Sequence, residues 1–184
     1  MVDGKKPEEK SEKKKKRPFR KAYLDDFHRN VAGEYIYTGP TRAWGSPRGR
    51  TLRRLWPLAL LALAAAVAGG CIPGCGIEQY PWSLVPYTVT LVLSFVQAWK
   101  LYKLTEGGDP VREYVWKSSA GWLPPLGLLT AVSALVTAAA ELVNLFLPGF
   151  SGNISMAIVF LLLKLTVAAA SLLMRRTVLR LEWA

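Results

Sequence analysis

The sequence predicts an all-α membrane protein whose four transmembrane helices form two antiparallel hairpins. From Leu55 onward, long apolar stretches are separated only by short loops. Each stretch has ~17–23 residues, enough to cross a hydrocarbon core of ~30 Å. None of them alternates as barrel strands do, and only helices or closed barrels can cross a bilayer with their backbone groups satisfied. The charge lies elsewhere, because 16 of the 24 Lys and Arg residues precede Leu55.

The first 18 residues are predicted to form a disordered basic tail, because Lys, Glu, Pro and Ser leave little to bury. Two interpretations of its basic run stay open: a solvated segment that sets topology, or a contact with anionic lipid head groups worth ~1 kcal/mol per residue. The residues expected at head groups are Lys13, Lys14, Lys15, Lys16, Arg17, Arg53 and Arg54. Nucleic-acid binding is not favoured, since no recognisable module accompanies the lysines.

Residues 19–50 are predicted to be a short cytoplasmic juxtamembrane segment. Its aromatic residues give it something to order with, and the turn-like Asn-Val-Ala-Gly at 30–33 precedes Glu-Tyr-Ile-Tyr-Thr-Gly-Pro. This pattern favours a β-hairpin that pairs 23–29 with 34–38. A short helix is the alternative, because the aromatic residues Phe19, Tyr23 and Phe27 recur every four residues.

Residues 51–184 are predicted to be the transmembrane domain, with spans at about 55–72, 82–104, 121–147 and 154–174. The first span is rich in Leu and Ala and carries no charge, so its small residues suit close helix packing. The long charged region before it is untypical of a cleaved signal peptide. A polar loop is expected between the second and third spans.

The distribution of basic residues predicts the orientation. The loops at 72–81 and 148–153 contain no Lys or Arg, whereas the tail, the 105–117 loop and the C-terminal segment contain them. The positive-inside rule therefore places both termini in the cytoplasm. We expect a multi-pass protein of the bacterial inner (plasma) membrane, in contact with lipid and, in particular, with anionic lipids.

Polar or small residues fall on one face of three spans, and in the fourth span Lys164 shares a face with Ala157, Ala168 and Ser171. In the third span Thr130, Ser133, Thr137, Glu141 and Asn144 are spaced by three or four residues, and the second span repeats this with Ser83, Tyr87, Thr90, Ser94 and Gln97. In lipid, such stripes should face one another. The predicted intramembrane polar seam consists of Glu141, Lys164, Asn144, Thr137, Gln97 and Thr90.

Glu141 and Lys164 have opposite charge and lie on consecutive helices, which suggests a partnership. Their depths differ by less than a lysine stem can cover, so a direct pair is feasible. One interpretation is a buried pair that fixes helix register. Another is a site for proton- or ion-coupled transport, because intramembrane carboxylates mark such pathways. The remaining ones are a counter-charge from a partner helix, and Lys164 reaching toward the interface.

Cys71 and Cys75 lie at the outer end of the first span. The outer face is oxidising, so a structural disulfide is one interpretation and two free thiols are another. Four-span disulfide oxidoreductases rely on a Cys-x-x-Cys pair and usually a second pair. Here three residues separate the cysteines and no second pair follows, so redox catalysis is the least favoured interpretation.

Other catalytic patterns are missing from the sequence. His28 is the single histidine, and no metal-spaced cluster, P-loop or dinucleotide fingerprint is found, so we expect no enzyme activity, metal or cofactor.

The pattern Phe19-Arg-Lys-Ala-Tyr with Gly33-Glu-Tyr-Ile-Tyr-Thr-Gly-Pro and four spans resembles a group of small bacterial membrane proteins. That resemblance implies no function.

The leading functional hypothesis is a non-enzymatic accessory or assembly component of an inner-membrane complex, with a membrane-protein partner. The first alternative is a small ion- or proton-coupled transporter, working as a homo-oligomer, that uses Glu141 and Lys164. The second alternative is a thiol-disulfide protein that uses Cys71 and Cys75.

Overall fold

The computed structural model describes residues 26–30, 33–148, 150–181 and 183. The chain divides into two compact units, Met1–Gly39 and Pro40–Ala184. The predicted disordered tail and its basic run at 13–17 lie outside the described residues.

The first unit contains the predicted hairpin. Strand β1 (Phe27–Arg29) pairs with β2 (Tyr35–Tyr37) in antiparallel register, with Phe27 opposite Tyr37. The two rings meet edge to face at 5.3 Å between centroids, an arrangement that aromatic pairs prefer. Gly33 has φ +84°, which a residue without a Cβ adopts without strain. The hairpin is confirmed for the described residues, and positions 23–25 of the expected first strand lie outside them.

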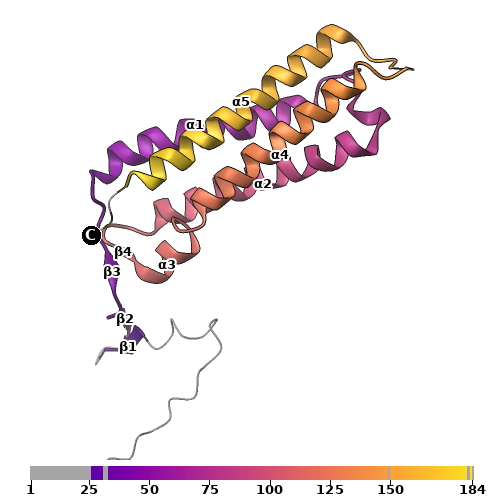
Figure 1. Ribbon diagram of the computed structural model, residues 1–184. Coiled ribbons are helices and arrows are strands. Elements are labelled where there is room, and N and C mark those ends of the chain that lie inside the picture. Colours follow the sequence, from indigo (N-terminus) through magenta and orange to yellow (C-terminus); the bar gives the residue numbers. More distant parts are fainter. Residues whose placement is uncertain (1–25, 31–32, 149, 182, 184) are drawn as a thin grey trace, which may run out of the picture. The chain divides into compact units, whose positions relative to one another are not determined.

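The second unit is built from four long helices, each long and apolar enough to cross a membrane. They are α1 (Arg48–Gly70), α2 (Pro81–Glu106), α4 (Leu123–Asn144) and α5 (Ile154–Leu179). Figure 1 shows them side by side as two antiparallel hairpins, α1–α2 and α4–α5. Helix α1 packs on α2 and α5, and α4 packs on the same two helices. The predicted fold class, a multi-pass membrane bundle, is confirmed.

The helix ends follow local chemistry. Helix α1 begins at Arg48, seven residues before the predicted span, because the basic segment before Leu55 is also helical. Helix α2 begins with Pro81, where a missing N–H is no loss. Helix α5 begins after Asn153, whose side chain accepts a 2.9 Å hydrogen bond from the Ser155 N–H as an N-cap.

Small residues fill the middle of the bundle. The buried residues that pack together there are Ala65, Ala66, Ala131, Ala134, Val167 and Ala168. They come from α1, α4 and α5. Because alanine projects little beyond the backbone, these helices approach closely in the centre.

One end of the bundle, the β3–β4 end, consists of residues 40–47, 107–122 and 180–183. Strand β3 (Thr41–Arg42) pairs antiparallel with β4 (Val111–Arg112), and the short helix α3 (Glu113–Ser118) follows. The expected polar loop between the second and third spans therefore contains structure. Trp44 and Trp183 form a further β-bridge, and their rings lie 4.9 Å apart.

An ion pair and a ring contact join the segments of this end. The Arg42 guanidinium donates hydrogen bonds of 2.6 and 3.3 Å to the two oxygens of Glu113. Lys117 lies 3.2 Å from the same carboxylate. The guanidinium also lies 3.9 Å from the Trp116 ring centroid, a cation–π contact.

The opposite end, the η2 end, consists of residues 71–80 and 145–153 and contains the short helix η2 (Ile77–Gln79). Here the two inter-helix loops touch each other. The Asn153 N–H donates a 2.8 Å hydrogen bond to the Gly74 carbonyl, and the Gln79 amide donates a 2.5 Å bond to Ser151 Oγ. The two helical hairpins are thus joined at this end.

Candidate functional site inside the bundle

The polar stripes of α2 and α4 face each other inside the bundle. Eight of their side chains are buried: Ser83, Thr90, Ser94, Gln97, Thr130, Thr137, Glu141 and Asn144. The cause is the helical period, which places residues three and four apart on one face. The stripes divide into a hydroxyl region at mid-depth and an amide–carboxyl region near the η2 end.

Hydroxyl groups join α2 and α4 at mid-depth. Thr90 Oγ1 donates to Ser133 Oγ at 2.9 Å, and Ser133 Oγ donates to the Pro86 carbonyl at 2.9 Å. Thr137 Oγ1 donates to the Ser133 carbonyl in its own helix and lies 3.5 Å from Thr90 Oγ1. These contacts satisfy their groups locally, so this region needs no ligand.

Asn144 is the centre of the amide–carboxyl region. Its Oδ1 accepts a 2.9 Å hydrogen bond from the Trp82 indole N–H. Its Nδ2 donates to Ser83 Oγ at 2.6 Å and to Glu141 Oε2 at 3.1 Å. Both ends of the amide are therefore used, and they fix two residues of α2 against Glu141 of α4.

Glu141 is fully buried, with 0% of its surface exposed. Its Oε2 is held by Asn144, but Oε1 has no hydrogen-bond partner among the described residues. Oε1 lies 3.2 Å from where a Cβ on Gly76 would be, so the loop at the η2 end passes directly over the carboxyl group. One carboxyl oxygen is thus buried with no hydrogen-bond partner in the described part of the chain.

Lys164 is also 0% exposed, and its Nζ has no hydrogen-bond acceptor among the described residues. The ammonium group instead faces aromatic rings, at 4.2 Å from the Tyr87 centroid and 4.7 Å from that of Phe160. A Cβ on Gly69 would lie 3.0 Å from Nζ, so a larger residue at this position of α1 would push the lysine head aside by a few tenths of an ångström. Cation–π attraction compensates part of the lost hydration.

The suggested direct pair between Glu141 and Lys164 is not formed in the structure. No ion pair involves either residue in the described part of the chain, because Glu141 turns toward α2 and Lys164 turns toward Tyr87 and α1. The two residues lie at similar depths along their helices, but their side chains do not point toward each other. Because Nζ is inside the bundle, Lys164 does not reach the interface, and an outside helix cannot touch it in this state.

The other predicted seam and head-group residues have separate environments. Gln97 is buried, and its Nε2 donates to Met174 Sδ of α5 at 2.9 Å, while its Oε1 has no partner among the described residues. Arg53 and Arg54 are exposed at the start of α1. They are placed where head groups could reach them.

The two cysteines are free, so the disulfide interpretation does not describe this structure. Cys71 is exposed at the end of α1, whereas Cys75 is buried against Ile77 and Phe160. Burial raises the pKa of the Cys75 thiol.

Three residues of this site were not singled out from the sequence. Trp82 is not among the predicted seam residues, yet its indole N–H donates a hydrogen bond to Asn144 Oδ1. Phe160 precedes Lys164 by four residues, so their common helix face was an available signal. No sequence pattern pointed to Gly69, because its contact with Lys164 depends on how closely α5 approaches α1.

Within the described ranges, no group of three or more His, Cys, Asp or Glu residues is placed to hold a metal ion. The site can exchange protons or receive a small polar ligand, since it has a carboxyl oxygen and an amine without partners. No protein family, curated protein or solved structure matches the chain.

Proposed function

We propose that this protein is a proton- or ion-coupled membrane transporter in which Glu141 and Lys164 are the working groups. The observation that supports this is that both side chains are fully buried in the same half of the bundle without an ion-pair partner among the described residues. A buried charge without a partner costs several kcal/mol. A purely structural role would favour a direct pair, because pairing reduces that cost, whereas unpaired intramembrane charges are typical of groups that bind a proton or ion.

The contrast within the seam favours this assignment. The hydroxyl groups of Thr90, Ser133 and Thr137 have partners, as a structural seam requires. Among the described residues of the η2 half, Glu141 Oε1 and Lys164 Nζ are the buried side-chain atoms without a hydrogen-bond partner. A buried polar atom without a partner calls for an explanation such as bound water, an ion or a functional role.

Proton flux in liposomes tests the proposal. The purified protein is reconstituted with an internal pH dye, and a pH gradient is applied with valinomycin and potassium present to prevent a charge build-up. We expect the wild type to dissipate the gradient faster than protein-free vesicles, and Glu141→Gln and Lys164→Met to return the rate to that of protein-free vesicles. Thr88→Val is the control, because this exposed hydroxyl binds only its own helix.

Two outcomes would contradict the proposal. One is a wild-type rate equal to that of protein-free vesicles across gradients of either direction. The other is a Glu141→Gln variant that is as active as the wild type. Size-exclusion profiles of all variants show whether a loss of flux reflects misfolding, and only variants with the wild-type profile are compared.

An accessory role is the second candidate, favoured by the β3–β4 end. There the Trp183 ring contacts the rings of Trp44 and Trp116, and these contacts join three segments of the chain. A rigid platform of this kind suits the docking of a partner protein. Affinity purification in mild detergent separates the candidates: a stoichiometric larger partner supports the accessory role, and a homo-oligomer supports transport.

We further propose that the protein lies in a bacterial inner membrane with both termini in the cytoplasm. The basic residues at the start of α1 support this, as does the lack of Lys and Arg at 72–81 and 148–153. Reporter fusions after residue 153 and before residue 26 test it. Reporters that act on the same side of the membrane would contradict it.

A further inference from the structure

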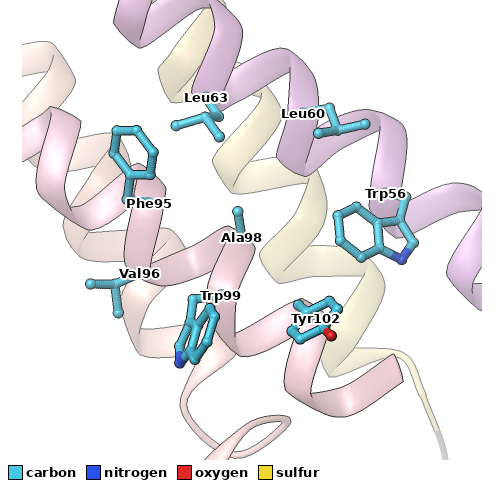
Figure 2. Close-up of a pocket in the computed structure, with 8 residues that line it drawn as sticks. All are labelled: Trp56, Leu60, Leu63, Phe95, Val96, Ala98, Trp99 and Tyr102. Atoms are coloured by element: carbon cyan, nitrogen blue, oxygen red, sulfur yellow. The ribbon is translucent and has the colours of Figure 1, made fainter. Parts of the chain in front are cut away.

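An apolar groove of about 500 Å³ runs between α1 and α2 on the outside of the bundle. Figure 2 shows Trp56, Leu60 and Leu63 of α1 on one side of it. They recur every three or four residues and so follow one stripe of the helix. Leu60 is 53% exposed, and the groove is therefore open to lipid.

The other side of the groove belongs to α2. Phe95, Ala98, Trp99 and Tyr102 line it, and Figure 2 shows the small Ala98 between the larger rings. The single methyl group of Ala98 leaves the space that a longer side chain would fill. Nearly the whole lining is carbon, so an occupant of the groove needs an apolar chain.

Two cations lie at the end of the groove that is nearer the β3–β4 end. Arg53 precedes Trp56 by three residues, continues the same stripe of α1 and is exposed. On α2, Lys103 is exposed, and its Nζ lies 5.6 Å from the Trp99 ring centroid. The acidic group on this face, Glu106, already accepts a 2.5 Å hydrogen bond from the Tyr102 hydroxyl.

We propose that this groove binds an anionic phospholipid, with one acyl chain between α1 and α2 and the phosphate at Arg53 and Lys103. The apolar lining matches an acyl chain, and the two cations at one end match a head group with net negative charge. Tryptophan and tyrosine at that end are typical of the level of the head groups. The site is on the lipid-facing surface, so it does not depend on the roles of Glu141 and Lys164.

Native mass spectrometry of the purified protein with added phosphatidylglycerol or phosphatidylcholine tests this proposal. We expect phosphatidylglycerol to bind more tightly to the wild type, and its affinity to fall about 5-fold in Arg53→Gln and about 25-fold in Arg53→Gln with Lys103→Gln. Ala98→Phe should fill the groove and weaken both lipids.

Two matched variants make the test specific. Arg54→Gln removes the same charge from the next residue, which is exposed on another face of α1. Arg54 can meet head groups of the surrounding bilayer but does not continue the stripe that lines the groove, so the affinity of the groove should stay unchanged. Ala169→Phe adds the same ring to an exposed alanine of α5 and should also have no effect. The selectivity for the anionic lipid should disappear in the double variant while its elution profile stays that of the wild type.

Three results would overturn the assignment. The first is equal binding of the two lipids by the wild type, and the second is an equal loss in Arg54→Gln and Arg53→Gln. The third is a second protein chain that is cross-linked in membranes from a photoreactive residue at Leu60, because that would assign the groove to a partner helix.

Discussion

Opposite charges meet at one end of the bundle and stay apart at the other. At the β3–β4 end, Arg42 and Glu113 come from segments far apart in sequence, and they form a bidentate ion pair. Near the η2 end, Glu141 and Lys164 come from consecutive helices, and each turns to a different neighbour. Closeness in sequence and opposite charge were thus not enough to produce a pair.

The difference lies in what each environment supplies. Arg42 has 37% of its side chain exposed, so water solvates the part of the guanidinium that Glu113 and Trp116 leave free. Glu141 and Lys164 are buried inside the bundle, where solvent does not reach them. The direction of each side chain is therefore set by helix packing. An amide and two aromatic rings then decide where the carboxyl and the amine lie. The exposed pair is explained by structure alone, whereas Glu141 and Lys164 are the groups for which we propose a function.

The largest effect on stability is expected at the η2 end, from Asn144→Leu. This change leaves Trp82, Ser83 and Glu141 without the amide that binds all three. We expect it to lower the free energy of unfolding by about 2–3 kcal/mol, measured by SDS titration in mixed micelles.

Thr166→Val is the control for that experiment, since its hydroxyl is exposed and binds only its own helix. An equal loss of stability in both variants would show that the amide has no special role. The comparison of the two ends would then lose its basis.

The packing between α4 and α5 gives the next effect. A Cβ on Gly127 would lie 2.9 Å from the Ser171 carbonyl oxygen, a backbone atom that cannot move aside alone. Gly127→Ala should therefore cost about 1–3 kcal/mol in the same SDS titration. Gly49→Ala, where nothing lies within 4 Å, should be neutral or stabilising because alanine favours helix. A neutral Gly127→Ala would contradict the close packing described here.

The reactivity of the two cysteines tests the description of the η2 end. In single-cysteine variants, maleimide should modify the exposed Cys71 at least about 10-fold faster than the buried Cys75 at neutral pH. The thiolate is the reactive form, and a raised pKa leaves less of it, so the Cys75 rate should keep rising with pH after that of an ordinary thiol has levelled off. Equal rates at all pH values would place Cys75 at the surface.

The smallest effect is expected at the β3–β4 end. Arg42→Gln removes a partly exposed ion pair, which contributes little to stability because water screens it, and the effect should shrink further at high salt. Thermal unfolding at two salt concentrations measures it, with the exposed Arg54→Gln as control. A loss larger than that of Asn144→Leu would reverse the comparison.

The architecture could be predicted because length and periodicity are local properties. Four apolar stretches predicted four helices, and the spacing of Thr130, Thr137, Glu141 and Asn144 indicated one face of the third, which is the buried face of α4. The α1 boundary was less accurate, because a basic segment can be helical outside the membrane.

The directions of individual side chains could not be predicted. Depth along a helix follows from counting residues, but whether Lys164 turns toward Glu141 or toward Tyr87 depends on how three helices are rotated against one another. The same limit applies to β3 and β4, since two strands of two residues, far apart in sequence, carry no detectable pattern.

The contact between the Gly74 carbonyl and the Asn153 N–H has a consequence for biogenesis. A ribosome delivers the α1–α2 hairpin to the insertion machinery before α4 and α5 exist. During that interval the hydroxyl-bearing face of α2 has no protein to cover it, and the loop carbonyl has no donor from the later hairpin. The first hairpin should therefore stay beside the insertion machinery until the second arrives and completes the bundle.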